Sequence, residues 1–383
     1  MTMRTIAVVT GTRAEYGYLK PLMHAINQEK QLTLLPIITG MHLLPEFGNT
    51  YKLVKKDFPA AKKIPMALKG DQLKHMAEYL ASGITNFANF LEKTRPDILV
   101  ILGDRSESLA AALAASYLNI PIAHINGGDV TGTTIDESIR HAITKIAHIH
   151  LVHTKANAER VEKMGEEKKR IFITGALTLD TIMHTTFLSK KDLFKKYHLD
   201  PAKTTFLVVQ HPLTTLKDQG YSQFKELFLA LDSLKEQAIL LYPNCDAGGK
   251  KFIDLIVTYE KKPYLHAFKN MPHEEYLGIM KSVDLMLGNS SSGIIEAPSF
   301  KIPVINIGSR QQGRERSANI IDVEPRKTKI LNAIDVALHN KVFLNKVQTC
   351  KNTFGDGNAA QKIVIILKEI PLTEKLIQKQ ITY

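Results

Sequence analysis

Residues that suit anion binding follow the first apolar run of the chain. Residues 11–17, with the sequence GTRAEYG, come directly after the run 6–9 and precede a helix-length amphipathic stretch at 18–28. A glycine turn between a strand and a helix presents backbone N–H groups and a positive helix end to an anion, and Arg13 adds a planar charged fork. The glycine spacing fits neither a Walker A motif nor a dinucleotide fingerprint. The turn is therefore predicted either as a phosphate contact or as an ordinary tight turn.

A second group of this kind lies in the other half of the chain. Residues 288–293, with the sequence GNSSSG, follow the apolar run 285–287 and precede a predicted helix. One serine is enough to cap a helix, so three favour a diphosphate ligand over a cap alone. Glu296 lies one turn further along, where a carboxylate could hold a ribose diol. His211 and Arg310 also follow predicted strands and could donate hydrogen bonds to a phosphate.

Carboxylates gather in the first half. Asp104 and Asp129 follow predicted strands, whereas Asp136 and Glu137 begin a predicted helix that also carries Arg140. Carboxylates grouped at strand ends raise one another's pKa by repulsion and desolvation, which suits acid and base catalysis. The plainer alternative is that the acids at 136 and 137 match the charge of a helix N-terminus and that Arg140 forms a local ion pair with one of them.

The elements that must position these side chains repeat a strand–loop–helix order. The predicted strands are 6–9, 34–38, 98–102, 120–125, 149–152 and 171–173 in the first half, and 206–209, 239–242, 285–287 and 304–307 in the second. Continuous apolar runs of this length are typical of parallel strands buried on both faces. The fold class is therefore predicted as α/β, with two doubly wound, Rossmann-like domains facing a cleft, and ligands bind at the carboxyl ends of such strands.

The length of 383 residues suits two domains. We place the first at 1–175 and the second at 176–365, joined around residues 175–200. The predicted helix 359–370 ends at Pro371, and residues 366–383 are expected as a segment that packs back on the first domain. The two halves share an architecture but no residue-level repeat.

Composition narrows the function classes. The net charge of +12 suits an anionic partner, but the lysines are scattered rather than aligned on one helix with aromatic residues, which argues against a nucleic-acid binder. The two cysteines, Cys245 and Cys350, form neither a disulfide framework nor a metal-ligand spacing, so no metal is expected. We recognise no signal peptide and no membrane span, and expect a cytoplasmic protein. The serines at 290–292 lie outside any nucleophile elbow, which argues against a serine hydrolase.

Taken together, the motifs resemble the hydrolysing UDP-N-acetylglucosamine 2-epimerases of sialic acid biosynthesis. The motifs that carry the resemblance run in order along nearly the whole chain: GTRAEYG at 11–17, GDR at 103–105, GGD at 127–129, IDESIRHAITK at 135–145, QHP at 210–212, YPN at 242–244, GNSSSG at 288–293, GSRQ at 308–311 and GDGNA at 355–359. The resemblance implies a fold like that of the GT-B glycosyltransferases, with uridine diphosphate (UDP) mainly on the second domain and the sugar facing the first.

The resemblance also implies roles for particular residues. The positions matching UDP contacts are Arg13, Arg105, Asn244, Ser290, Ser291, Glu296 and Arg310. The positions matching the catalytic or sugar site are Asp104, Asp129, Asp136, Glu137 and Arg140, with His211 beside the departing phosphate. This chain has Asn126 where many relatives have an acid or a histidine. Because asparagine is not a base at neutral pH, any proton abstraction that relatives carry out at that position is expected to be carried out here by Asp104 or Asp129.

The implied reaction converts UDP-N-acetylglucosamine and water to UDP and N-acetylmannosamine. It proceeds by elimination to 2-acetamidoglucal and then hydration, without a cofactor. Related members act on UDP-2,4-diacetamido-2,4,6-trideoxy-glucose in the route to legionaminic acid, and this substrate is the alternative. Further alternatives are a glycosyltransferase, a non-hydrolysing epimerase and a nucleotide-sugar-binding module without turnover. A homodimer or homotetramer is implied by the family, with neither nucleic acid nor membrane as partner.

Overall fold

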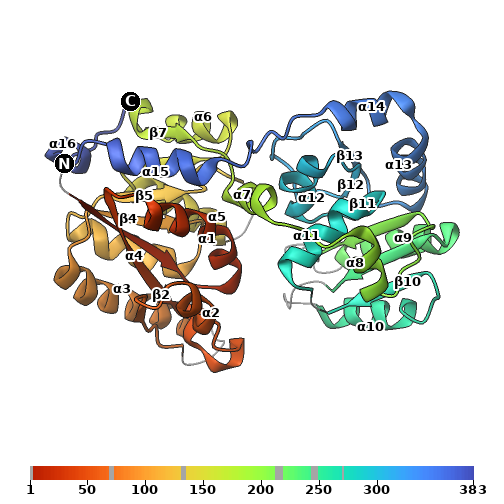
Figure 1. The fold of residues 1–383 in the computed structure, drawn as a ribbon, viewed down its shortest axis with the longest axis horizontal. Helices are drawn as coiled ribbons and strands as arrows, with labels where there is room; N and C mark the ends of the chain where they lie inside the picture. Colours follow the sequence, from red (N-terminus) through yellow and green to blue (C-terminus); the bar gives the residue numbers. More distant parts are fainter. Residues whose placement is uncertain (1–2, 69–72, 131–134, 212–218, 243–248, 270) are drawn as a thin grey trace. The chain divides into compact units, whose positions relative to one another are not determined.

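The computed structural model describes residues 3–68, 73–130, 135–211, 219–242, 249–269 and 271–383. The chain divides into two compact units. The first unit comprises residues 1–183 and 354–383, and the second comprises residues 184–353. Each unit is an α/β body built on one parallel sheet (Figure 1). Among the described residues, no helix combines the length and apolar character needed to cross a bilayer.

The first unit is built on a seven-stranded parallel sheet in the order β3-β2-β1-β4-β5-β6-β7. Its strands are β1 (Arg4–Thr10), β2 (Leu32–Thr39), β3 (Lys62–Ile64), β4 (Ile98–Leu102), β5 (Ile122–Ile125), β6 (Ile149–Val152) and β7 (Ile171–Ile173). Successive residues of β1 alternate between two buried clusters, with Ile6 and Val8 on one face and Ala7 and Val9 on the other. A strand covered on both faces needs an unbroken apolar run, which explains the sequence pattern.

Helices cover both faces of this sheet. They are α1 (Arg13–Gln28), α2 (Tyr51–Asp57), α3 (Leu73–Thr94), α4 (Ser106–Tyr117), α5 (Ile135–Ile146), α6 (Lys155–Lys163) and α7 (Leu177–His184), with short turns η1 (Gly40–Leu43), η2 (Pro45–Phe47) and η3 (Lys168–Arg170). α1 packs in the cluster of Ile6 and Val8, and α3 and α4 pack in the cluster of Ala7 and Val9.

Two late helices, α15 (Ala359–Glu369) and α16 (Glu374–Ile377), also belong to the first unit. α15 packs against α1, with Ile363 and Leu367 in the same core cluster (Figure 1). The carboxylate of Asp180, on α7, caps α15 by accepting from the N–H groups of Ala359 at 3.0 Å and Ala360 at 2.8 Å. The sequence divides the chain at residues 175 and 365, whereas the compact units divide at 183 and 353, because α15 as a whole completes the core of the first unit.

The second unit is built on a six-stranded parallel sheet in the order β10-β9-β8-β11-β12-β13. The strands are β8 (Thr205–Val209), β9 (Gln237–Leu241), β10 (Leu265–Phe268), β11 (Leu285–Gly288), β12 (Val304–Ile307) and β13 (Ile320–Val323). The helices are α8 (Lys190–Lys196), α9 (Gln219–Leu234), α10 (Gly249–Tyr259), α11 (His273–Ser282), α12 (Ser291–Ile295), α13 (Lys327–His339) and α14 (Lys341–Thr349), with the turn η4 (Ala297–Phe300). Its strands likewise alternate between two buried clusters.

Both sheets reverse their strand order beside their first strand. The reversal falls between β1 and β4 in the first unit and between β8 and β11 in the second. The space beyond the carboxyl ends of such strands is the usual ligand site of a doubly wound sheet. The two parallel α/β halves predicted from the sequence are confirmed. Of the residues singled out there, Arg13 and Asp104 follow the strands at the first reversal, and His211 and Ser290 follow those at the second.

Candidate functional site

The carboxyl end of β4 meets the first turns of α5 through one buried guanidinium. Arg140, whose side chain is 3% exposed, forms an ion pair with Asp104, which follows β4. Its Nη1 also lies 3.4 Å from Oε2 of Glu137 and donates to the carbonyl of Asp129 at 3.1 Å. Arg140 therefore forms the local ion pair with Glu137 that the sequence offered as an alternative. It also connects α5 to the segment after β4 and to the segment after β5.

The other two acids of this group differ in exposure. Asp129 is buried, whereas Asp136 is exposed on the first turn of α5. Asp129 follows Gly128, which has a φ of +72° and no room for a side chain, because a Cβ there would lie 2.5 Å from the carbonyl oxygen of Asn157. Glycine at position 128 therefore allows the backbone to pass close to α6 directly before Asp129.

The turn after β1 uses its backbone N–H groups internally. The carboxylate of Glu15 accepts from the N–H of Gly11 at 2.7 Å and of Thr12 at 3.0 Å, and Thr12 in turn caps the N–H of Glu15. This reciprocal arrangement is a capping box. These two N–H groups are thus engaged by a side chain of the same turn, and the anion contact expected here depends on Arg13, which is exposed.

A second buried carboxylate lies beside this turn. Glu107, on α4, accepts from the hydroxyl of Tyr79 at 2.8 Å and pairs with Nε of Arg105 at 3.2 Å. Burial and the charge of Glu107 raise the pKa of Glu15 to about 7, against a lowering by Arg105 and the two backbone donors. Arg105, expected as a UDP contact, is therefore tied to a buried acid at this edge.

Glu15, Glu107 and Tyr79 have no assigned role in the sequence-based prediction. The only signal for Glu15 was its position three residues after Thr12, which is the spacing of a capping box. The tight packing of Glu107 against the neighbouring turns also shows in Gly40, where a Cβ would lie 2.5 Å from its Oε1. The raised pKa of Glu15 thus belongs to a carboxyl that the sequence did not single out.

In the second unit, the ends of β8, β11 and β12 are joined by Asn289. Its side chain accepts from the N–H of His211 at 2.7 Å and donates to the carbonyl of His211 at 2.9 Å. Its own carbonyl accepts from Arg310 at 3.1 Å and from Gln311 at 2.8 Å. His211 and Arg310 are thereby gathered next to Ser290, as the sequence predicts. Asn289 itself was part of a predicted motif without a role.

The serines at the start of α12 share several hydrogen bonds. Ser290 caps the helix by accepting from the N–H of Ser292 at 3.3 Å, and the two hydroxyl oxygens lie 2.8 Å apart. The hydroxyl of Tyr276, on α11, lies 2.5 Å from that of Ser292. Ser290 is thus a cap as well as a candidate phosphate contact, and Ser291, the first residue of the helix, is half-buried beside it.

Glu296 and His211 complete the candidate residues at this end of the second sheet. Glu296, expected to hold a ribose, is buried at the end of α12, with Nε2 of His273 3.9 Å from its Oε1. Burial and the positive charge of Arg310 lower the pKa of His211 to about 4. At neutral pH the imidazole of His211 is therefore uncharged and can donate one ring N–H.

One predicted UDP contact, Asn244, lies outside the described residues. In the described part of the chain, no group of three or more histidine, cysteine or acidic side chains is arranged to hold a metal ion. The geometry thus offers carboxylates with a buried arginine at one sheet edge, and hydroxyl, imidazole and guanidinium donors at the other.

A family model described as UDP-N-acetylglucosamine 2-epimerase matches residues 24–368. The chain belongs to this family. It is therefore a UDP-sugar 2-epimerase, and the resemblance read from the motifs is confirmed.

Among curated relatives, this epimerase is 39% identical to the UDP-N,N'-diacetylbacillosamine 2-epimerase (hydrolyzing) of Legionella pneumophila, over 98% of this chain and 99% of that protein. It is 34% identical to the UDP-N-acetylglucosamine 2-epimerase of Neisseria meningitidis, over 88% of each chain.

A crystal structure of UDP-GlcNAc 2-epimerase from Neisseria meningitidis bound to UDP-GlcNAc matches this fold with a TM-score of 0.80, at 19% identity, over 95% of this chain and 99% of that one. At this identity the likeness concerns the fold, and it confirms the predicted GT-B-like class of the epimerase.

Proposed function

We propose that this epimerase is hydrolysing and that its substrate is UDP-2,4-diacetamido-2,4,6-trideoxy-glucose, also called UDP-N,N'-diacetylbacillosamine. The products are UDP and the free sugar with its C2 configuration inverted. The observation that carries the proposal is the 39% identity, over almost the full length of both chains, to a relative named for this substrate and for hydrolysis. The sequence alone favoured UDP-N-acetylglucosamine, which becomes the second candidate.

The proposed reaction has two steps. In the first, the bond between C1 and the phosphate oxygen breaks, UDP leaves with the bonding electrons, and a base removes the proton at C2, so that a C1–C2 double bond forms. In the second, water adds its hydroxyl to C1 and an acid returns a proton to C2 on the opposite face. Atoms balance with water as the only co-reactant, and one base and one acid are enough.

The first unit supplies the proton-transfer groups in this proposal. Asp104 and Glu137 both contact Arg140, which is buried and holds their carboxylates close to each other. The charged donor restrains the orientation of both carboxylates. Asp129 and Asp136 complete the proposed set of acids.

The second unit supplies most of the proposed UDP contacts. Arg310 and the hydroxyls of Ser290 and Ser291 are proposed to bind the phosphate oxygens, and His211 donates its ring N–H to the departing group. Charge grows on the phosphate as the C1–O bond breaks, so these donors stabilise the transition state more than the substrate. Glu296 is proposed to hold the ribose diol. The remaining proposed UDP contacts are Arg13, Arg105 and Asn244.

The second candidate substrate is UDP-N-acetylglucosamine. The 34% identity to the Neisseria meningitidis enzyme named for it supports this alternative. The two substrates share the diphosphate, C1 and C2, and differ at C4 and C6, so the same acids and donors serve both. Assembly as a homodimer or homotetramer stays a prediction from the resemblance.

The test is product identification with the two UDP-sugars side by side. Equal concentrations of each are incubated with the epimerase, and the products are followed by proton and phosphorus NMR. The proposal predicts free UDP and a free 2-epimerised sugar, formed faster from the 2,4-diacetamido substrate. Faster turnover of UDP-N-acetylglucosamine would establish the second candidate instead. Formation of a UDP-linked epimer without free UDP would show a non-hydrolysing enzyme.

A further inference from the structure

A buried histidine contacts the residue that precedes Asp104. His124, in the middle of β5, is fully buried, and its Nε2 lies 2.8 Å from the carbonyl oxygen of Gly103. Because a carbonyl oxygen only accepts, Nε2 must carry the ring proton. The N–H of Gly103 is also held by β5, since it donates to the carbonyl of Ile125 at 2.9 Å. Both polar groups of the residue that precedes Asp104 are therefore fixed by one neighbouring strand.

The other nitrogen of the same ring faces α5. Nδ1 of His124 lies 3.3 Å from the hydroxyl oxygen of Thr144, which is 2.9 Å from the carbonyl oxygen of Arg140. The single hydroxyl proton of Thr144 has these two acceptors within reach. The imidazole thus donates directly to the carbonyl before Asp104. Its Nδ1 carries no proton, so it can only accept from the hydroxyl of Thr144, where it competes with the carbonyl of Arg140.

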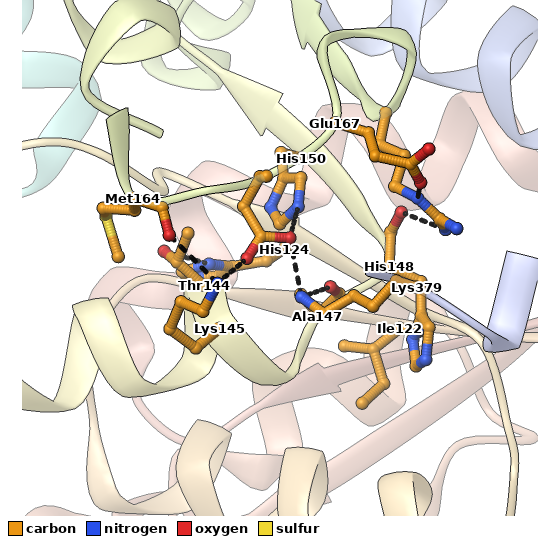
Figure 2. A network of polar contacts seen from close by, with 12 residues as sticks. Ile122, His124, Thr144, Lys145, Ala147, His148, His150, Met164, Glu167 and Lys379 are labelled. Atoms are coloured by element: carbon orange, nitrogen blue, oxygen red, sulfur yellow. Dashed lines mark hydrogen bonds and ion pairs between the residues drawn. The ribbon is translucent and has the colours of Figure 1, made fainter. Parts of the chain in front are cut away.

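A network of polar and charged groups begins on the next strand. His150, on β6, is the register partner of His124, and its Nε2 lies 3.1 Å from the buried carboxylate of Glu166. Glu166 also accepts from Lys145, in the last turn of α5, and from Lys379, each at 2.6 Å. Figure 2 shows His124 and the side chains of this network, with His150, Lys145 and Lys379 labelled. Lys145 thereby holds the last turn of α5, while Arg140 is held in the middle of the helix.

His124 and Glu166 keep one charge state across the neutral range. Burial lowers the pKa of His124 to about 3, against a raising by its hydrogen bond to Gly103. Burial alone would raise the pKa of Glu166, but hydrogen bonds from His150, Lys145 and Lys379 hold it at about 2. The ring of His124 is therefore a permanent neutral donor rather than a proton carrier.

We propose that His124 is a positioning residue of the epimerase reaction, which sets the Asp104–Arg140 pair by holding the Gly103 carbonyl, while the Thr144 hydroxyl beside Nδ1 fixes the orientation of the ring. The inference rests on the proposed catalytic role of Asp104. Gly103 has a φ of +75° and no side chain to restrain it, so without the imidazole the peptide before Asp104 gains freedom to rotate. A displacement of about 1 Å at a reacting group can cost about a hundredfold in rate.

The experiment compares His124→Leu, which removes the donor, with His124→Gln, whose amide can donate to the same carbonyl. His148→Leu is the matched control. His148 is also buried beside β5, where its Nδ1 accepts from the N–H of Ile122 at 3.1 Å, but that contact lies at the start of the strand rather than at its carboxyl end. For each variant, kcat, KM, UDP affinity and the melting temperature are measured with the substrate that wild type turns over.

The expected result is a loss of kcat of about tenfold to a hundredfold in His124→Leu, with KM and UDP affinity unchanged. His124→Gln recovers most of the rate. His148→Leu loses melting temperature but keeps kcat. Unchanged kcat in His124→Leu, or an equal loss of kcat in His148→Leu, would overturn the proposal.

Two additions keep the test decisive. If His124→Leu does not fold, Thr144→Val removes only the hydroxyl that orients the ring at Nδ1, and a fall in kcat without a change in KM supports the proposal, whereas unchanged kcat contradicts it. If wild type turns over neither UDP-sugar, the proposed function fails. The crystal structure of the leucine or valine variant then decides the inference separately. A rotated Gly103 peptide and an opened Asp104–Arg140 pair support it, and an unchanged pair contradicts it.

Discussion

The two sheets end in opposite chemistry. Both reverse their strand order beside the first strand and both place polar residues there. In the first unit that edge carries carboxylates around the buried guanidinium of Arg140, and the N–H groups after β1 are engaged by Glu15. In the second it carries hydroxyls, an uncharged imidazole and the guanidinium of Arg310. The shared fold therefore places polar residues at the carboxyl ends of the strands in both units. The types of these side chains make the first unit suited to proton transfer and the second to binding an anion.

The largest expected effect separates the two edges. Asp104→Asn should lower kcat by about 10²- to 10⁴-fold, because the amide cannot exchange a proton, while UDP affinity stays that of wild type. Turnover is followed by UDP release and affinity by calorimetry. Asp97→Asn is the matched control, because Asp97 precedes the same strand at its other end, where it accepts from the N–H of Thr5. Retention of wild-type kcat in Asp104→Asn would end the assignment of acids to the first edge.

The converse change is made at the second edge. Arg310→Ala should weaken UDP binding by about tenfold to a hundredfold, since a charge-assisted hydrogen bond to phosphate is lost. Arg326→Ala is the control, because Arg326 is exposed and pairs with Glu324 on the surface of the same unit. Equal UDP affinity in the two variants would contradict the comparison of the two edges.

A third prediction concerns the negative charge buried at the first edge. The folded-state pKa of Glu15 is raised from 4.5 to about 7, so wild type holds this proton more tightly when folded and loses that stability as the pH rises from 4.5 through 7. Glu15→Gln lacks this loss. Its stability relative to wild type should therefore rise over this range, by about 2–3 kcal/mol.

The measurement is urea unfolding of both proteins between pH 5 and 8. Glu92→Gln, a change at an exposed carboxyl of α3, serves as the control and should show no such trend. A stability difference between Glu15→Gln and wild type that stays constant or falls with pH would rule out the buried, proton-holding carboxyl.

The smallest expected effect sharpens the second edge. Burial and Arg310 lower the pKa of His211 to about 4, and a bound diphosphate should raise this pKa because its negative charge favours the imidazolium. UDP binding at pH 5–6 should then take up a fraction of a proton, which calorimetry in buffers of different ionisation enthalpy detects. His211→Gln should abolish the uptake. The same uptake in wild type and variant would remove His211 from the diphosphate site.

The sequence predicts the central strands well, because a short, continuous apolar run must be buried on both faces. A run such as 98–102 can be buried only in a strand covered on both faces, and β4 spans these residues. The edge strand β3, with exposed Lys62 and Lys63, was missed because an edge strand needs only part of its surface apolar. The placement of α15 in the first unit depends on Asp180 and on α1, far away in sequence, and no local pattern carries that information.

The candidate site shows the same limit. Residue types at strand ends pointed to Asp104, Ser290 and Arg310, since the ends of parallel strands share one edge. Arg140 was singled out on a predicted helix. The sequence could not show that Arg140 pairs with Asp104 as well as with its helix neighbour Glu137, because that pairing depends on how α5 packs beside β4. The roles of Glu15, Asn289 and His124 were missed for a similar reason, since each contacts backbone groups of turns whose geometry is set by the whole unit.

The most direct test of the central claim, that the first-edge carboxylates exchange the proton at C2, is turnover in deuterium oxide. The UDP-2,4-diacetamido sugar and UDP-N-acetylglucosamine are each incubated with wild type and with Asp104→Asn, and the C2 position of the released sugar is read by proton NMR. We predict one deuterium at C2 of the inverted product from wild type, and with the variant a release of product and an exchange at C2 that are both slower by about 10²- to 10⁴-fold. Inverted product that keeps its original C2 hydrogen would contradict the mechanism.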